Sequence, residues 1–111
     1  MNGKISNYLL SMGFIPNKIG YKYLGDLVAL GIDGKDILPL SKNGYVVLAE
    51  KYNKSASTIE KDIQNAISAA WLKGDIDLLN KEFGSTIDMK KGKPSNKHFI
   101  LTAIEKLSYD D

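Results

Sequence analysis

The sequence contains no cysteine and only one histidine. Without cysteine the chain forms neither a disulfide framework nor a thiolate metal site, and His98 alone cannot make a two-histidine metal site. It also lacks the glycine-rich GxxxxGK[ST] and GxGxxG patterns that cradle nucleotide phosphates. We therefore expect no enzyme activity, no cofactor and no metal. The absence of cysteine suits a reducing, cytoplasmic location.

Long hydrophobic runs are also absent, so no segment is expected to cross a bilayer, and the N-terminus does not resemble a signal peptide. We expect no membrane partner. The 111 residues are 43% hydrophobic and 25% charged. These values fit a single domain spanning residues 1–111 that buries a core without disulfides or metal.

Arginine is missing too, because all 15 basic residues are lysine. Lysine neutralises phosphate as a point charge but lacks the planar fork that binds guanine through two hydrogen bonds. We favour an A/T-rich coding bias, which turns arginine codons into lysine codons, as the explanation. The net charge of +2 is by itself only a weak indication of nucleic-acid binding.

Apolar residues recur at helical spacing and β-branched residues are scattered, so the sequence predicts an all-α fold of about six helices. Ile19 and Val46 are expected on the buried sides of their helices, and Trp71 in the core. The segment 32–41 is expected to be a turn with a short helical piece, and 85–95 a loop or short hairpin. The expected helices cover residues 4–12, a segment from Pro16 or Asn17 to 30, 42–52, 55–73, a segment from Asp75 to 83, and a segment from 95 or 96 to 107.

The third and fourth predicted helices are joined by a few residues, which is typical of a helix-turn-helix. Ala49 is small enough for a close helix crossing, Asn53 tolerates the left-handed conformation at the turn, and Ile59 can lock the second helix. Asp62 stands where an apolar residue is usual, and Ile63 takes over that role. Many helical hairpins share this pattern, so the motif alone does not establish DNA binding.

The fourth predicted helix has one apolar and one polar side. Ser57 and Glu60 have the spacing of a capping box, and Ser55 is the alternative N-cap. Amide side chains match the donor–acceptor pair of adenine, and a threonine methyl can contact a thymine methyl. The polar side is either a DNA-reading surface or an ordinary solvated face. It carries Lys61, Gln64, Asn65 and Ser68, with Ser57 and Thr58 near its N-terminal edge.

Two stretches, "NKSASTIEKDIQNAISAAWLKGDID" and "FGSTIDMKKGKPSNKHFI", resemble the C-terminal effector domain of the stage-zero sporulation response regulator, sporulation protein A. The similarity runs from about residue 5 to residue 107. It implies a six-helix DNA-binding domain that controls transcription, binds short DNA boxes in tandem or as a dimer, and reads them with the helix starting near Ser55. It also implies that the segment 75–83 contacts the sigma subunit of RNA polymerase.

At several reading positions the chain departs from the family. The resemblance places Thr58 where the family has a guanine-reading arginine, and Gln64 and Asn65 where it has an arginine and a histidine. The family's glutamate and its next basic contact are kept as Glu60 and Lys61. The target sequence should therefore differ from that of the family. The family's full-length regulator also has a receiver domain, so the chain is either an excised fragment or an orphan effector domain.

We predict double-stranded DNA as the partner, with a homodimer or tandem pair and the sigma subunit as further partners. The alternative is an interaction module that kept the fold and modulates a full-length regulator or RNA polymerase; the missing arginines and slight charge motivate it. The predicted base-reading residues are Thr58, Glu60, Lys61, Gln64 and Asn65. The predicted phosphate-binding residues are Lys54, Ser55, Ser57, Lys73, Lys90, Lys91 and Lys93.

Overall fold

The computed structural model describes residues 3–74, 76–83 and 92–109. This part of the chain contains helices and no strand, which confirms the predicted all-α fold. None of its helices is long and apolar enough to cross a membrane. The helices are α1 (Gly3–Ser11), α2 (Ile19–Ile32), α3 (Gly44–Tyr52), α4 (Ala56–Lys73), α5 (Ile76–Phe83) and α6 (Asn96–Tyr109).

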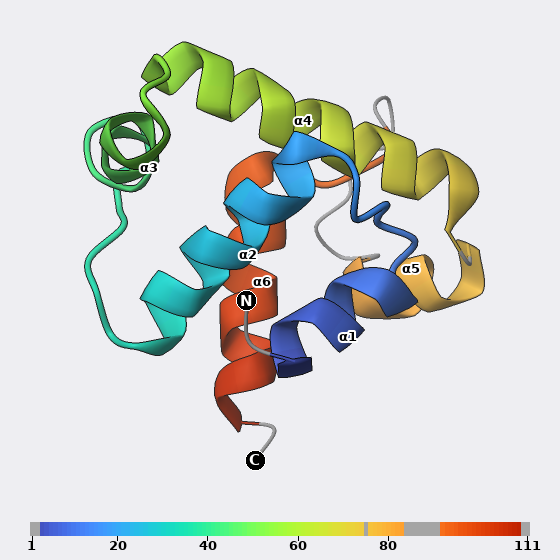
Figure 1. The fold of residues 1–111 in the computed structure, drawn as a ribbon. Coiled ribbons are helices and arrows are strands. Elements are labelled where there is room, and N and C mark those ends of the chain that lie inside the picture. Colours follow the sequence, from blue (N-terminus) through green and yellow to red (C-terminus); the bar gives the residue numbers. More distant parts are fainter. Residues whose placement is uncertain (1–2, 75, 84–91, 110–111) are drawn as a thin grey trace.

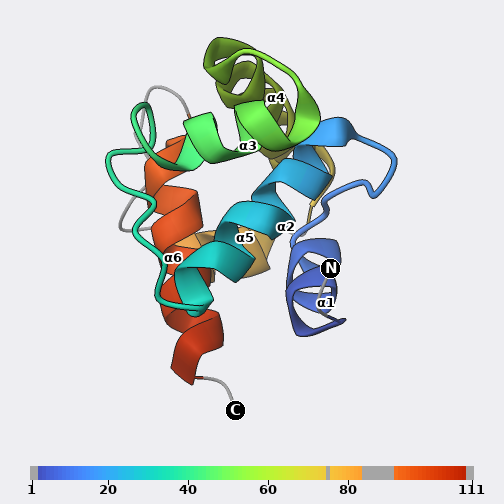
Figure 2. The ribbon, with the colours of Figure 1, turned by 60° about the vertical axis from the view of Figure 1, so that its left-hand side comes forward.

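Helix α2 is the centre of the fold, because it packs against α1, α3, α4 and α6. Figure 1 shows α4 lying across one side of the molecule, from α3 at one end to α5 at the other, with α2 and α6 beneath it. In the view of Figure 2, α3 and α4 again lie together at one edge of the molecule. The outer side of α4 is not covered by another helix in either view.

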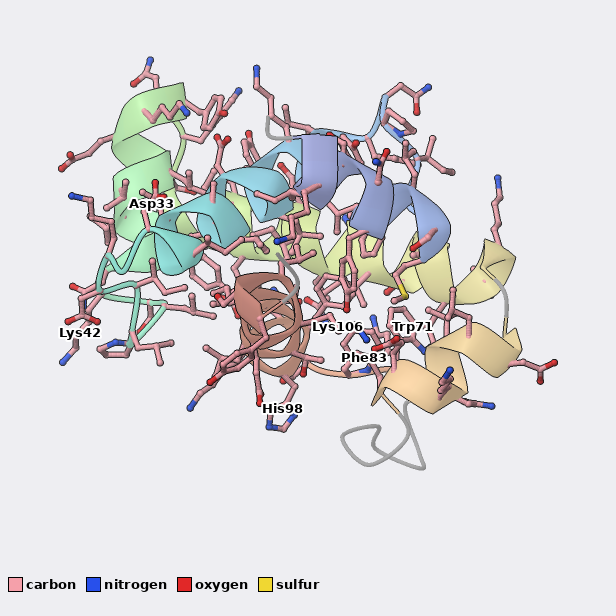
Figure 3. The ribbon with its side chains drawn as sticks, turned by 90° about the horizontal axis from the view of Figure 1, so that it is seen from below. Asp33, Lys42, Trp71, Phe83, His98 and Lys106 are labelled. Carbon is pink, nitrogen blue, oxygen red and sulfur yellow. The ribbon has the colours of Figure 1, made fainter. Side chains whose placement is uncertain are left out.

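Within the described ranges, the buried apolar side chains form one cluster to which all six helices contribute. An aromatic group joins α4, α5 and α6: the rings of Phe83 and Phe99 stack with centroids 5.1 Å apart. Trp71 packs edge-on against both rings, at 5.4 Å and 6.0 Å. Figure 3 shows Trp71 and Phe83 close together between α4 and α5. The prediction that Trp71 belongs to the core is confirmed.

Two glycines allow backbones to approach α4 very closely. A Cβ atom at Gly20 of α2 would lie 2.2 Å from the carbonyl oxygen of Asp62. A Cβ atom at Gly13, after α1, would lie 2.6 Å from Cα of Gly74, at the end of α4. The contact at Gly20 explains why α4 tolerates an aspartate at an otherwise apolar position. Helix α2 contacts the backbone of Asp62, and the side chain of Asp62 stays half-exposed.

Several predicted details were wrong. Residues 16 and 17 form a turn and α2 begins only at Ile19, whose side chain is 49% exposed. Val46 is 37% exposed because it lies on the outward side of the short helix α3. Helix α2 continues past Gly31, which packs against Ile104, and residues 33–43 contain turns but no helix. The predictions for Asp75 and for residues 84–91 fall outside the described residues.

Candidate nucleic-acid interface

Helices α3 and α4 are joined by residues 53–55, as the helix-turn-helix pattern predicts. Asn53 has φ 54° and ψ 50°, which is the left-handed conformation expected for it. The N–H of Lys54 donates to the carbonyl oxygen of Ala49 at 3.0 Å and closes the end of α3. Ile59 is fully buried, so it anchors the start of α4 in the core. In Figure 1 α3 is seen end-on while α4 lies across the page, so the two helices cross steeply.

The start of α4 is capped by Ser55 and not by Ser57. Oγ of Ser55 accepts from the backbone N–H of Thr58 at 3.1 Å and donates to Oγ1 of Thr58 at 2.8 Å. Ser57 lies inside the first turn of the helix, so the predicted Ser57–Glu60 capping box is wrong and the alternative N-cap is confirmed. A helix start capped in this way holds its remaining backbone N–H groups near the solvent, where an anion is favoured.

All five predicted base-reading side chains are exposed on α4. At 3.6 residues per turn, Lys61 lies opposite the buried side of the helix, which Ile59 and Ile63 occupy. Thr58 lies on the flank nearer α2, while Glu60 and Gln64 lie on the flank nearer the start of α6. The predicted phosphate-binding residues Lys54, Ser55, Ser57 and Lys73 are exposed as well.

Lys73 lies apart from the other predicted contacts. It is at the C-terminal end of α4, 15 residues after Thr58, which corresponds to about 22 Å along a helix. A duplex that contacts the first turns of α4 would therefore meet Lys73 only at a distant part of its backbone. Lys90 and Lys91 lie outside the described residues.

The segment 93–96 runs beside α4 and is held to it at two points. Nζ of Lys93 donates to Oγ of Ser68, which in turn donates to the carbonyl oxygen of Gln64 at 3.0 Å. Nδ2 of Asn96 donates to the carbonyl oxygen of Glu60 at 3.0 Å. Lys93, predicted to bind phosphate, is thus half-buried on the flank of α4.

Asn96 is a residue of the site that sequence reasoning missed. Its Nδ2 also donates to the hydroxyl oxygen of Tyr45 at 3.2 Å, so one amide connects α3, α4 and α6. Burial raises the pKa of Tyr45, the bond from Asn96 lowers it, and the charge of Glu60 raises it. Beside these contacts lies a cavity of about 690 Å³ between the 38–41 turn, α4 and the segment 93–97.

The family described as "Sporulation initiation factor Spo0A C terminal" matches residues 5–107 of the 111-residue chain. The chain belongs to this family. The Spo0A C-terminal family comprises DNA-binding regulatory domains of a sporulation transcription factor and is not a known enzyme family. DNA binding in transcription regulation is therefore the function at the level of the family, and the matched range covers the whole α3–α4 unit.

In this member of the Spo0A C-terminal family, the described residues include no group of three or more His, Cys, Asp or Glu side chains arranged to hold a metal ion. His98 lies in the first turn of α6, exposed and pointing away from the helices around it (Figure 3). Its backbone N–H donates to Oγ of Ser95 at 3.1 Å, so Ser95 caps the start of α6.

Proposed function

We propose that the chain is a sequence-specific transcriptional regulator that inserts the outer side of α4 into the major groove of DNA. Thr58, Glu60, Lys61, Gln64 and Asn65 would read the bases. The remaining predicted residues would contact the phosphate backbone: Lys54, Ser55, Ser57, Lys73, Lys90, Lys91 and Lys93. Lys73 would meet a more distant part of that backbone, and Lys93 would have to exchange its bond to Ser68 for one to a phosphate.

The observation that carries this proposal is the contrast between the two sides of α4. Its inner side is buried against the core, with Ile59, Ile63 and Ile67 at most 1% exposed. Its outer side presents a lysine, two amides and two hydroxyl groups to solvent over its first three turns. A recognition helix requires this combination, since one side must fix the helix to the protein while the other enters the groove.

The chemistry of the outer side favours targets containing A·T pairs. Gln64 and Asn65 can donate to and accept from adenine, and the methyl group of Thr58 fits the methyl group of thymine. Glu60 can accept from the amino group of cytosine. Since arginine is absent, guanine cannot be read by a planar guanidinium fork, and Lys61 can offer it only the point charge of an ammonium group. Each bidentate contact that is made should contribute about 1–3 kcal/mol of discrimination.

A selection from a random duplex library tests this proposal. The parent should enrich a short motif, and a motif repeated at a fixed spacing would support a dimer or tandem pair. The double variant Lys61→Ala with Gln64→Ala should still bind DNA at low salt but should lose the preference for the enriched motif. Fluorescence anisotropy with the selected and a scrambled duplex measures both quantities.

Lys35→Ala is the matched control, because it removes one positive charge from an exposed turn beyond the far end of α2. The N-terminal end of α2 contacts α4, and its C-terminal end lies about 20 Å away along the helix. The control should keep the parental motif. If the double variant also enriches the parental motif, α4 does not read the bases.

A protein partner is the second candidate, and the exposure of Leu72 favours it. This side chain is 87% exposed on the last turn of α4, immediately before α5. The end of α4 together with α5 would then contact RNA polymerase, as the resemblance implies for its sigma subunit. Leu72→Ala should reduce transcription activation while DNA affinity stays parental. Equal activation by the variant would exclude a contact at this residue.

A further inference from the structure

The segment 93–96 is hydrogen-bonded to the flank of α4 through Lys93 and Asn96. Neither bond is part of the proposed base contacts. The two attachment points, at Glu60 and at Ser68, are eight residues apart on α4, which is about 12 Å along the helix. Gln64 lies between them on the same flank, because residues four apart are neighbours on a helix surface. The segment therefore runs beside two of the side chains assigned to base reading.

The direction of the Asn96 bond is fixed by its partner. A carbonyl oxygen can only accept, so the amide nitrogen of Asn96 must face Glu60, and the same nitrogen reaches the hydroxyl oxygen of Tyr45. The carbonyl oxygen of Glu60 has a second lone pair available for the bond within the helix. Asn96 is the first residue of α6, and Phe99 one turn later is fully buried. The amide is therefore attached to a fixed part of the core.

We propose that Asn96 is a positioning residue for base recognition, which it supports by fixing the rotation of α4 about its own axis. This inference rests on the proposed function. The core side chains of α4 and its close contact with Gly20 hold the buried side of the helix and the flank toward α2, but neither holds the flank toward α6. A bond to the backbone on that flank opposes rotation of α4 directly. Groups that must meet a partner need to be held within about 0.5 Å and 10–20° of the working geometry.

The rotation matters most for Glu60 and Gln64. Both lie on the flank next to Asn96, so a turn of α4 moves them toward or away from one wall of the groove. Loss of the amide should therefore reduce discrimination between the selected duplex and duplexes mismatched at the positions these residues read. Of the two bonds that Asn96 makes, the one to Glu60 acts on α4, and loss of one hydrogen bond corresponds to a reduction of this discrimination by about five-fold. The slope of affinity against salt should be unchanged, since it reflects the number of phosphate contacts.

Two substitutions at the same position test the inference. Asn96→Ala removes the amide, and Asn96→Asp keeps its shape but cannot donate to a carbonyl oxygen. In the aspartate variant, the favourable position of an acidic residue in the first turn of a helix offsets the repulsion between its carboxylate and the carbonyl oxygen of Glu60. Its negative charge weakens binding to every duplex alike, so the ratio between matched and mismatched duplexes remains a fair readout. Both variants should lower that ratio about five-fold.

Ser95→Ala is the matched control. It removes the cap of α6 at the neighbouring residue and leaves the Asn96 amide in place. This variant should lose thermal stability and keep the parental ratio. Parental discrimination in Asn96→Ala or Asn96→Asp would overturn the inference alone, and so would an equal loss in Ser95→Ala. If the parent itself enriches no motif, the proposed function fails and the inference fails with it.

Discussion

Replacing Gly20 by alanine should destabilise the protein at the crossing of α2 and α4. The added Cβ would lie 2.2 Å from the carbonyl oxygen of Asp62 and 2.9 Å from its carbonyl carbon. It would also lie 2.7 Å from Cβ of Ala66. All three atoms belong to α4 and two of them are backbone, so no rotation of a flexible side chain can relieve the contact. The two helices must separate instead.

The size of the effect follows from two opposing contributions. Alanine in place of glycine within a helix normally stabilises by about 0.5–1 kcal/mol. Overpacking a close-packed interior costs about 1–3 kcal/mol, and the cost is at the upper end here because a helix backbone must move. The free energy of unfolding should therefore fall by about 2 kcal/mol, which corresponds to a fall in Tm of about 10 °C.

Two other glycines provide a graded comparison by urea and thermal denaturation monitored by circular dichroism. A Cβ at Gly3 has no atom within 4 Å, so Gly3→Ala should leave stability unchanged or raise it slightly. A Cβ at Gly31 meets only the side chain of Ile104, so Gly31→Ala should have an intermediate effect. If Gly20→Ala is as stable as the parent, the close approach of α2 to α4 is wrong.

Three further predictions concern the turn and the tyrosines. Ser55→Ala should cost about 1 kcal/mol of unfolding free energy in urea denaturation, while Ser57→Ala should be nearly neutral; the reverse order would restore the capping box. Asn53→Ala should cost about 1 kcal/mol because alanine is strained in the left-handed conformation, whereas Asn53→Gly should retain parental stability. Burial is the largest cause that raises the pKa of Tyr8, Tyr23, Tyr45 and Tyr52. Since these folded-state pKa values exceed the usual value of about 10, the free energy of unfolding should be unaffected below pH 10 and fall as the pH rises further. A constant free energy of unfolding between pH 8 and 11 would contradict this prediction.

Much of the fold could be predicted because helix periodicity is a local property. The apolar spacing located all six helices, and the tolerance of asparagine for the left-handed conformation located the turn at Asn53. The first residue of each helix was harder to predict. Two serines two residues apart can both cap a helix, and the choice of Ser55 depends on where the chain leaves the turn. Likewise, the exposure of Ile19 depends on which neighbour covers the start of α2.

The site was predictable only in part, for a different reason. The polar side of α4 can be derived from spacing within one helix, so its exposed residues were found. The bond between Asn96 and Glu60 joins residues 36 positions apart in the chain. Nothing in local spacing specifies which carbonyl oxygen an asparagine at a helix start will meet. Only the packing of α6 against the α3–α4 unit brings them together.

Helix α4 contacts two separate parts of the molecule, the start of α2 and the end of α1. Gly20 touches it near Asp62, and Gly13 touches its last residues beside Gly74. Its 18 residues form one uninterrupted helix of about 27 Å, which spans the distance between these two contacts. The end of α1 and the start of α2 therefore both set the position of α4, so added bulk at either glycine would shift the helix that carries the predicted base-reading residues.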